Sequence, residues 1–141
     1  GEVFTSPIED SVNGEIFFDY PTLMHGRDVQ GIRLKVSEGW ITEWSANVGQ
    51  DVLDEVFAVE GTRRFGEAAI GTNTHISRAT RNILFDEKIG GTVHMAIGQS
   101  YYQCGCKNQS SIHWDLIADM KNGGRIFADD QLIYENGVFL I

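Results

Sequence analysis

Short segments in which apolar and polar residues alternate, separated by glycine-containing turns, are the feature of this sequence that most restricts its fold. Residues 31–37 have apolar side chains at every second position, the pattern of a β-strand with one buried face. After a turn at residues 38–39, residues 40–46 alternate again and are expected to pair with them as a hairpin. The C-terminal part repeats the pattern and predicts a meander of strands at residues 124–128, 131–134 and 138–141.

Two segments depart from this alternation. Residues 50–59 place Val52, Leu53 and Val56 at helical spacing, with acidic residues on the opposite face. Residues 78–86 are expected to form a second, shorter helix. The sequence therefore predicts an α+β fold: a mostly antiparallel β-sheet, barrel-like or strongly twisted, with one or two packed helices.

Length and charge narrow the classes of protein to which the chain can belong. Its 141 residues are expected to fold as a single domain, residues 1–141, around one core. The formal net charge of −9 argues against a nucleic-acid partner, because binding to phosphates requires a basic surface. Apolar runs are only a few residues long, so no membrane span is expected.

The two cysteines, Cys104 and Cys106, are separated by one residue in a polar stretch. A disulfide between such close neighbours would be strained, so both are expected to be free thiols in a loop. A zinc site at this position would need a second pair of ligands, and the sequence has no other cysteine. Free thiols are typical of a reducing compartment, and we expect a cytoplasmic location.

His113 and Asp115 are the first candidate functional residues. Residues 111–120 alternate as in a strand, so these two side chains should point to one face, about 7 Å apart along the strand. A neutral imidazole and a carboxylate are ligands that zinc, cobalt or manganese accepts. A hydrogen-bonded histidine–aspartate pair without a metal is the alternative interpretation of this pair taken alone.

Three more ionisable residues lie in apolar segments, where charged groups are costly unless they are paired or bind a metal. His94 lies in an apolar run bounded by glycines, and Glu67 lies in a short apolar segment with small neighbours. Glu2 stands at the head of a predicted strand. The combined set is rich in carboxylates and fits two divalent ions better than one closed structural zinc site: Glu2, Glu67, His94, His113 and Asp115.

The order of several segments resembles the C-terminal domain of the thermophilic-type metallo-aminopeptidases, the family of aminopeptidase T and aminopeptidase S. These blocks cover essentially the whole chain in the order of the family, and the ordered set is specific although no single block is. The resemblance rests on residues 1–7 with 10–14, 65–70, 84–87 leading into 93–98, 113–117 and 134–139.

The resemblance implies a metal-dependent aminopeptidase that removes the N-terminal residue from peptide substrates with two divalent ions (zinc, cobalt or manganese) and a metal-bridging water. The five residues above would hold the ions. Tyr101 would lie close to them and hydrogen-bond the tetrahedral intermediate, with Tyr102 as the alternative if the register shifts by one. Family members are longer and carry an upstream α/β domain, which implies that this chain is a fragment; a homodimer is expected for the intact protein.

Two other interpretations stay open at this point. A mononuclear iron oxygenase would use His94, His113 and Asp115 as a triad of two histidines and one carboxylate, which leaves Glu2 and Glu67 without a role. A non-catalytic assembly or metal-binding module is the second, because loss of an upstream domain would expose an apolar surface. The number of metal ions bound per chain separates a mononuclear centre from a two-metal site.

Overall fold

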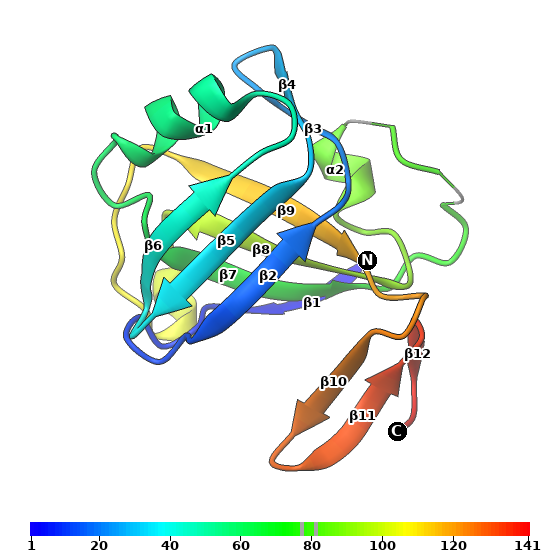
Figure 1. Cartoon of the computed structure of the whole chain (residues 1–141). Coiled ribbons are helices and arrows are strands. Elements are labelled where there is room, and N and C mark those ends of the chain that lie inside the picture. The colour runs from blue at the N-terminus through cyan, green and yellow to red at the C-terminus, as the bar shows by residue number, and fades with distance from the viewer. Residues whose placement is uncertain (77, 81) are drawn as a thin grey trace.

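Two antiparallel sheets that lie face to face form most of the fold (Figure 1). The computed structural model describes residues 1–76, 78–80 and 82–141. The larger sheet has the order β1 (Glu2–Thr5), β7 (Phe65–Gly71), β8 (Thr92–Gly98) and β9 (His113–Asp119). The smaller sheet has the order β2 (Gly14–Phe18), β5 (Ile32–Ser37) and β6 (Trp40–Ser45).

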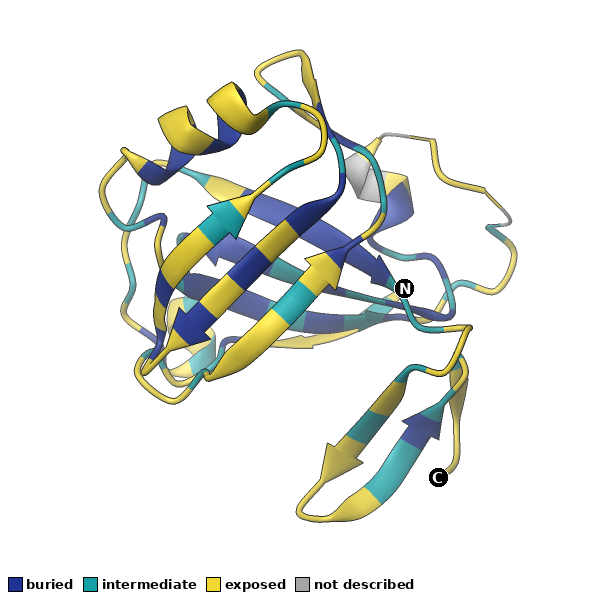
Figure 2. Cartoon of the chain, viewed as in Figure 1, coloured by how far each residue is buried: buried dark blue, intermediate teal, exposed yellow. Residues whose placement is uncertain are grey.

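The core lies between these sheets. Along β5, Ile32, Leu34 and Val36 are buried while the residues between them are exposed, an alternation that Figure 2 shows as bands along the strand. Ile97 of β8 and Trp114 of β9 belong to the same buried cluster from the opposite sheet. The larger sheet therefore uses one face for the core, and its other face is free to carry a different set of side chains.

The remaining elements extend this framework. Helix α1 (Gln50–Phe57) contributes Val52, Leu53, Val56 and Phe57 to the core. The hairpin of β3 (Thr22–Met24) and β4 (Arg27–Val29) contacts α1 through β4. A short helix α2 (Ile83–Asp86) lies between β7 and β8, and a 3-10 turn η1 (Tyr102–Cys104) lies between β8 and β9. The C-terminal meander consists of β10 (Arg125–Ala128), β11 (Gln131–Glu135) and β12 (Val138–Phe139).

The predicted α+β class is confirmed, with two details corrected. Over the described residues the strands form separate twisted sheets and no closed barrel, so the barrel-like alternative is wrong. The predicted helix at residues 78–86 is present only as α2, although residue 81 lies outside the described residues. Ahead of α2, the Thr80 backbone N–H donates a hydrogen bond to the Asp86 carboxylate at 2.8 Å. Among the described residues, no helix has the length and apolar composition needed to cross a membrane.

Removing one methyl group from the core should lower stability measurably. Ile41 of β6 is fully buried, so Ile41→Val is expected to cost about 0.5–1.5 kcal/mol of unfolding free energy. The matched change at the exposed neighbour, Thr42→Ser, should stay within about 0.5 kcal/mol of wild type. Urea unfolding of the two variants measures the difference, and equal values would contradict the placement of β6 over the core.

Candidate metal centre

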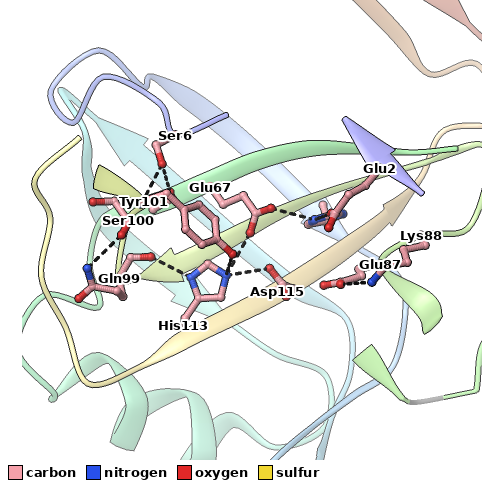
Figure 3. A network of polar contacts seen from close by, with 12 residues as sticks. Glu2, Ser6, Glu67, Glu87, Lys88, Gln99, Ser100, Tyr101, His113 and Asp115 are labelled. Carbon is pink, nitrogen blue, oxygen red and sulfur yellow. Dashed lines mark hydrogen bonds and ion pairs between the residues drawn. The ribbon is translucent and has the colours of Figure 1, made fainter. Parts of the chain in front are cut away.

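The face of the larger sheet that points away from the core carries a cluster of carboxylates and imidazoles (Figure 3). In the strand register, Ala96 pairs with both Glu67 and Asp115, and Ala69 pairs with His94. Directly paired residues of an antiparallel sheet share a face. The register therefore brings side chains from three neighbouring strands onto one surface.

A β-bulge at Gly66 aims Glu67 at this cluster. Phe65 lies in the core, and two residues later Glu67 pairs with Ala96 on the opposite face, because the register shifts between Phe65 and Glu67. An uninterrupted strand would have placed both side chains on the same face. Glycine is required at the bulge, since a Cβ on Gly66 would lie 2.3 Å from the carbonyl oxygen of Gln99.

His113 faces two carboxylates at the start of β9. Its Nε2 atom lies 3.0 Å from Glu67 Oε2 and 3.3 Å from Asp115 Oδ1. Its Nδ1–H donates to the carbonyl oxygen of Gln99 at 2.8 Å. That backbone contact fixes the orientation of the ring and leaves Nε2 as the nitrogen that faces the cluster.

His94 faces two other carboxylate oxygens from the centre of β8, where it is fully buried. Its Nε2 atom lies 2.9 Å from Glu2 Oε2 and 3.5 Å from Glu67 Oε1. Glu2 comes from the edge strand β1, as the sequence predicts for an acid at the head of a strand. One carboxylate, that of Glu67, thus lies within 3.5 Å of the Nε2 atoms of both histidines.

Several polar atoms of this cluster are buried without a hydrogen-bond partner among the described residues. They are Glu2 Oε2, Asp115 Oδ1 and both ring nitrogens of His94. Glu2 Oε2 and His94 Nε2 are close, yet they lack the alignment of a hydrogen bond. Burying such an atom without a partner costs about 1–3 kcal/mol of folding free energy. A divalent cation binds oxygen and nitrogen lone pairs of this kind and would supply the missing partner.

Glu87 joins the cluster although sequence patterns do not single it out. It follows α2 and is buried. Its carboxylate lies within 4.8 Å of ligand atoms of His94 and Asp115, close enough for the three to hold one ion. Burial, reinforced by the neighbouring Asp115 carboxylate, raises the pKa of Glu87 to about 7. On its outer side, Lys88 Nζ lies 2.5 Å from Glu87 Oε1. The sequence feature that could have pointed to Glu87 is its position at the end of residues 84–87, a block on which the family resemblance partly rests.

The potential ligands fall into overlapping groups whose ligand atoms lie within 4.8 Å of one another. Glu67 belongs to two groups, one around each histidine, and a carboxylate shared in this way is suited to bridge two ions. The groups within the described residues are Glu2, Glu67 and His94; Glu67, His113 and Asp115; and Glu87, His94 and Asp115.

Charge pairing in this cluster shifts the protonation of its members. Burial raises the pKa of Glu67, but the hydrogen-bonded His113 imidazole and the nearby His94 imidazole outweigh it and lower the pKa to about 2. The neighbouring carboxylates of Asp115 and Glu67 raise the pKa of His113 to about 10. Without a metal, Glu67 and His113 therefore form an ion pair at neutral pH. A metal ion that takes this position must displace the imidazolium proton.

Tyr101, and not Tyr102, lies beside the cluster. The Oη atom of Tyr101 is 3.4 Å from His113 Nε2, and the two rings are 5.3 Å apart. Tyr102 is exposed, and its Oη accepts a hydrogen bond from Gln109 at 2.6 Å. Burial and the nearby carboxylates raise the pKa of Tyr101 to about 12, so its phenol keeps a proton to donate.

Both cysteines are free, as expected from their spacing. Cys106 is nevertheless buried, and its thiol donates a hydrogen bond to the carbonyl oxygen of Pro7 at 2.7 Å. It ties the loop after η1 to the segment that follows β1.

The sequence matches a known family over nearly its whole length. The thermophilic metalloprotease (M29) family matches residues 1–139. The chain belongs to the M29 family. Aminopeptidase 2 of Geobacillus stearothermophilus is 32% identical over 105 residues, and aminopeptidase T of Thermus thermophilus is 31% identical over 105 residues. These matches cover 71% and 72% of this chain, but only 25% and 26% of the relatives, so the chain spans about a quarter of their length.

Solved structures share the fold of this M29 chain. Wild-type AmpT from Thermus thermophilus matches with a TM-score of 0.83 at 25% identity, over 99% of this chain and 39% of AmpT. A 2,5-dihydroxypyridine dioxygenase from Pseudomonas putida matches with a TM-score of 0.74 at 18% identity, over 97% of this chain and 42% of the dioxygenase. The second match is one of fold alone.

Proposed function

We propose that this chain is the metal-binding catalytic domain of a longer metallo-aminopeptidase, which removes N-terminal residues from peptides with two divalent ions. The observation that carries the proposal is the Glu67 carboxylate, which lies between the two histidines and has a further carboxylate beside each. Membership of the M29 family and the named aminopeptidases among its relatives support the reaction class. The proposed ligands are Glu2, Glu67, Glu87, His94, His113 and Asp115.

The chemistry divides between the ions and the chain. When bound, the two ions would lower the pKa of a bridging water and polarise the peptide carbonyl. The Tyr101 phenol would donate a hydrogen bond to the oxyanion that forms on that carbonyl. The free α-amine of a substrate would bind one of the ions or a carboxylate of the site, which would account for cleavage at the N-terminus rather than within a chain.

Two substrates that differ only at the amine test this function. With zinc, cobalt or manganese added after dialysis, leucine p-nitroanilide is expected to be hydrolysed, and N-acetyl-leucine p-nitroanilide is not. The metal-free chain is the control for both. Equal hydrolysis of both substrates would contradict an aminopeptidase. Binding of two ions without hydrolysis would instead favour a metal-binding module that is not catalytic by itself.

Glu87→Gln tests whether this residue is a ligand. The amide keeps the size of the side chain but removes its charge, so the affinity for one of the two ions should fall by more than the loss of about 10–100-fold that follows removal of a residue that only supports a ligand. The other ion, held by His113 and its carboxylates, should bind as in wild type. Titration calorimetry separates the two events, and two unchanged affinities would exclude Glu87 from the ligands.

A mononuclear iron oxygenase is the second candidate, because the cluster contains two histidines and a carboxylate of the types that bind non-haem iron. Its triad would have to contain His94, His113 and Asp115 around one ion. Among the described residues, however, the two histidines fall into different ligand groups, with Glu67 between them. A single Fe²⁺ per chain, together with oxygen consumption, would favour the oxygenase over the aminopeptidase.

A further inference from the structure

Ser6 is a buried residue outside the proposed ligands that contacts two parts of the site. It follows β1, and its Oγ donates a hydrogen bond to the carbonyl oxygen of Gly66 at 2.7 Å. The same Oγ accepts a hydrogen bond from the backbone N–H of Tyr101 at 3.1 Å. One hydroxyl thus joins the residue before Glu67 to the residue whose phenol lies over His113 (Figure 3).

Tyr101 needs such an anchor because it lies beyond the sheet. β8 ends at Gly98, and the backbone of Tyr101 is extended just ahead of η1. Its N–H therefore has no partner in a strand ladder and is satisfied by Ser6. The adjacent Tyr102 is exposed, so the chain reaches the protein surface immediately after this contact.

The other hydrogen bond of Ser6 ends at the bulge that orients Glu67. Gly66 packs against the carbonyl group of Gln99 with no room for a Cβ. The same carbonyl accepts the hydrogen bond that orients His113. The Ser6 hydroxyl therefore lies next to the backbone groups that hold the side chains of Glu67, Tyr101 and His113 in place.

We propose that Ser6 is a positioning residue, whose hydroxyl holds the Tyr101 phenol in register with Glu67 and His113. It touches neither substrate nor ion. The proposal rests on the aminopeptidase function and on the assignment of Tyr101 to the oxyanion. Its energetic basis is that a misplaced catalytic group loses most of its effect: a displacement of about 1 Å costs about 100-fold.

A double-mutant cycle tests the proposal. Tyr101→Phe should lower kcat by about 100-fold or more, as expected for loss of one oxyanion donor. Ser6→Ala should lower kcat by about 10-fold, with KM within about twofold and the number of bound ions unchanged. In the Tyr101→Phe background, Ser6→Ala should have almost no further effect, because there is no phenol left to position.

Hydrogen exchange gives a readout that does not depend on activity. In the metal-free chain, Ser6→Ala should accelerate exchange of the Tyr101 amide, whereas Ser6→Thr keeps a hydroxyl and should restore both the protection and kcat. Ser11→Ala is the matched control, because Ser11 is exposed and its hydroxyl bonds to the carbonyl oxygen of Ile8.

Three results would overturn the positioning role: wild-type kcat in Ser6→Ala, an equal loss of kcat in the Tyr101→Phe background, or unchanged exchange at the Tyr101 amide. Failure of the proposed function has a different signature. In that case the wild-type chain with added metal does not hydrolyse leucine p-nitroanilide at all, and the exchange experiment alone decides whether Ser6 holds Tyr101.

Discussion

Glu67→Gln is expected to abolish hydrolysis and to weaken the binding of both metal ions by more than about 100-fold each. The Glu67 carboxylate lies 3.0 Å from His113 Nε2 and 3.5 Å from His94 Nε2, so a single residue contributes to both proposed ion positions. Even residues that only support a ligand change metal affinity by about 10–100-fold, and loss of a shared charged ligand should exceed that. Glutamine preserves the shape of the side chain, so the change isolates its charge.

Titration calorimetry with Zn²⁺ or Co²⁺ measures both affinities in the Glu67→Gln variant. Glu60→Gln is the matched control, because Glu60 is an exposed glutamate and should leave both affinities at the wild-type values. Loss of only one ion in Glu67→Gln would show that this carboxylate does not bridge. Two ions bound with wild-type affinity would remove Glu67 from the site altogether.

The metal-free chain is expected to lose stability as the pH rises from about 6.5 to about 10. The pKa of His113 is raised from 6.5 to about 10 by Asp115 and Glu67, so its stabilisation is complete below pH 6.5 and is lost through that interval. Glu87 acts in the same direction at lower pH, because its raised pKa of about 7 makes ionisation unfavourable in the folded chain. Glu67, with its pKa lowered from 4.5 to about 2, adds stability that is lost only as the pH falls below 4.5.

Thermal unfolding in a chelator at pH 5.5, 7.5 and 9.5 measures this effect, and the Tm should fall at each step. In His113→Gln the decline above pH 7.5 should be much smaller, because the group that loses its proton there is absent. Metal binding should show the opposite trend, with affinity rising by about tenfold per pH unit for each proton displaced. A Tm that is constant or rises between pH 6.5 and 10 would contradict the ion pair of Glu67 and His113.

Local sequence patterns predict the strands and most of the candidate site residues. Alternation gives β5 and β6 within one residue, and it places His113 and Asp115 on one face, where Nε2 and Oδ1 are 3.3 Å apart. Ionisable groups in apolar runs stand out because burial of a charge is costly. Glu67 and His94 are recognisable for that reason, and both are buried beside the other candidates.

Features that depend on contacts between distant segments are not predictable in this way. The bulge at Gly66 is invisible to a period-two pattern, which would put Phe65 and Glu67 on the same face. Glu87 lies in no apolar run, and only the packing of the segment around α2 brings it to His94. The family resemblance favours Tyr101 over Tyr102, but local patterns do not separate them; the structure does, because Tyr101 Oη lies 3.4 Å from His113 Nε2.

The number of divalent ions bound per chain tests the central claim most directly. Metal analysis after loading with Zn²⁺ or Co²⁺ and dialysis, combined with calorimetric titration of the metal-free chain, gives this number together with the affinities. We expect two ions per chain in wild type, both weakened by Glu67→Gln. One ion per chain, or binding that does not respond to Glu67→Gln, would contradict a two-metal centre built around this carboxylate.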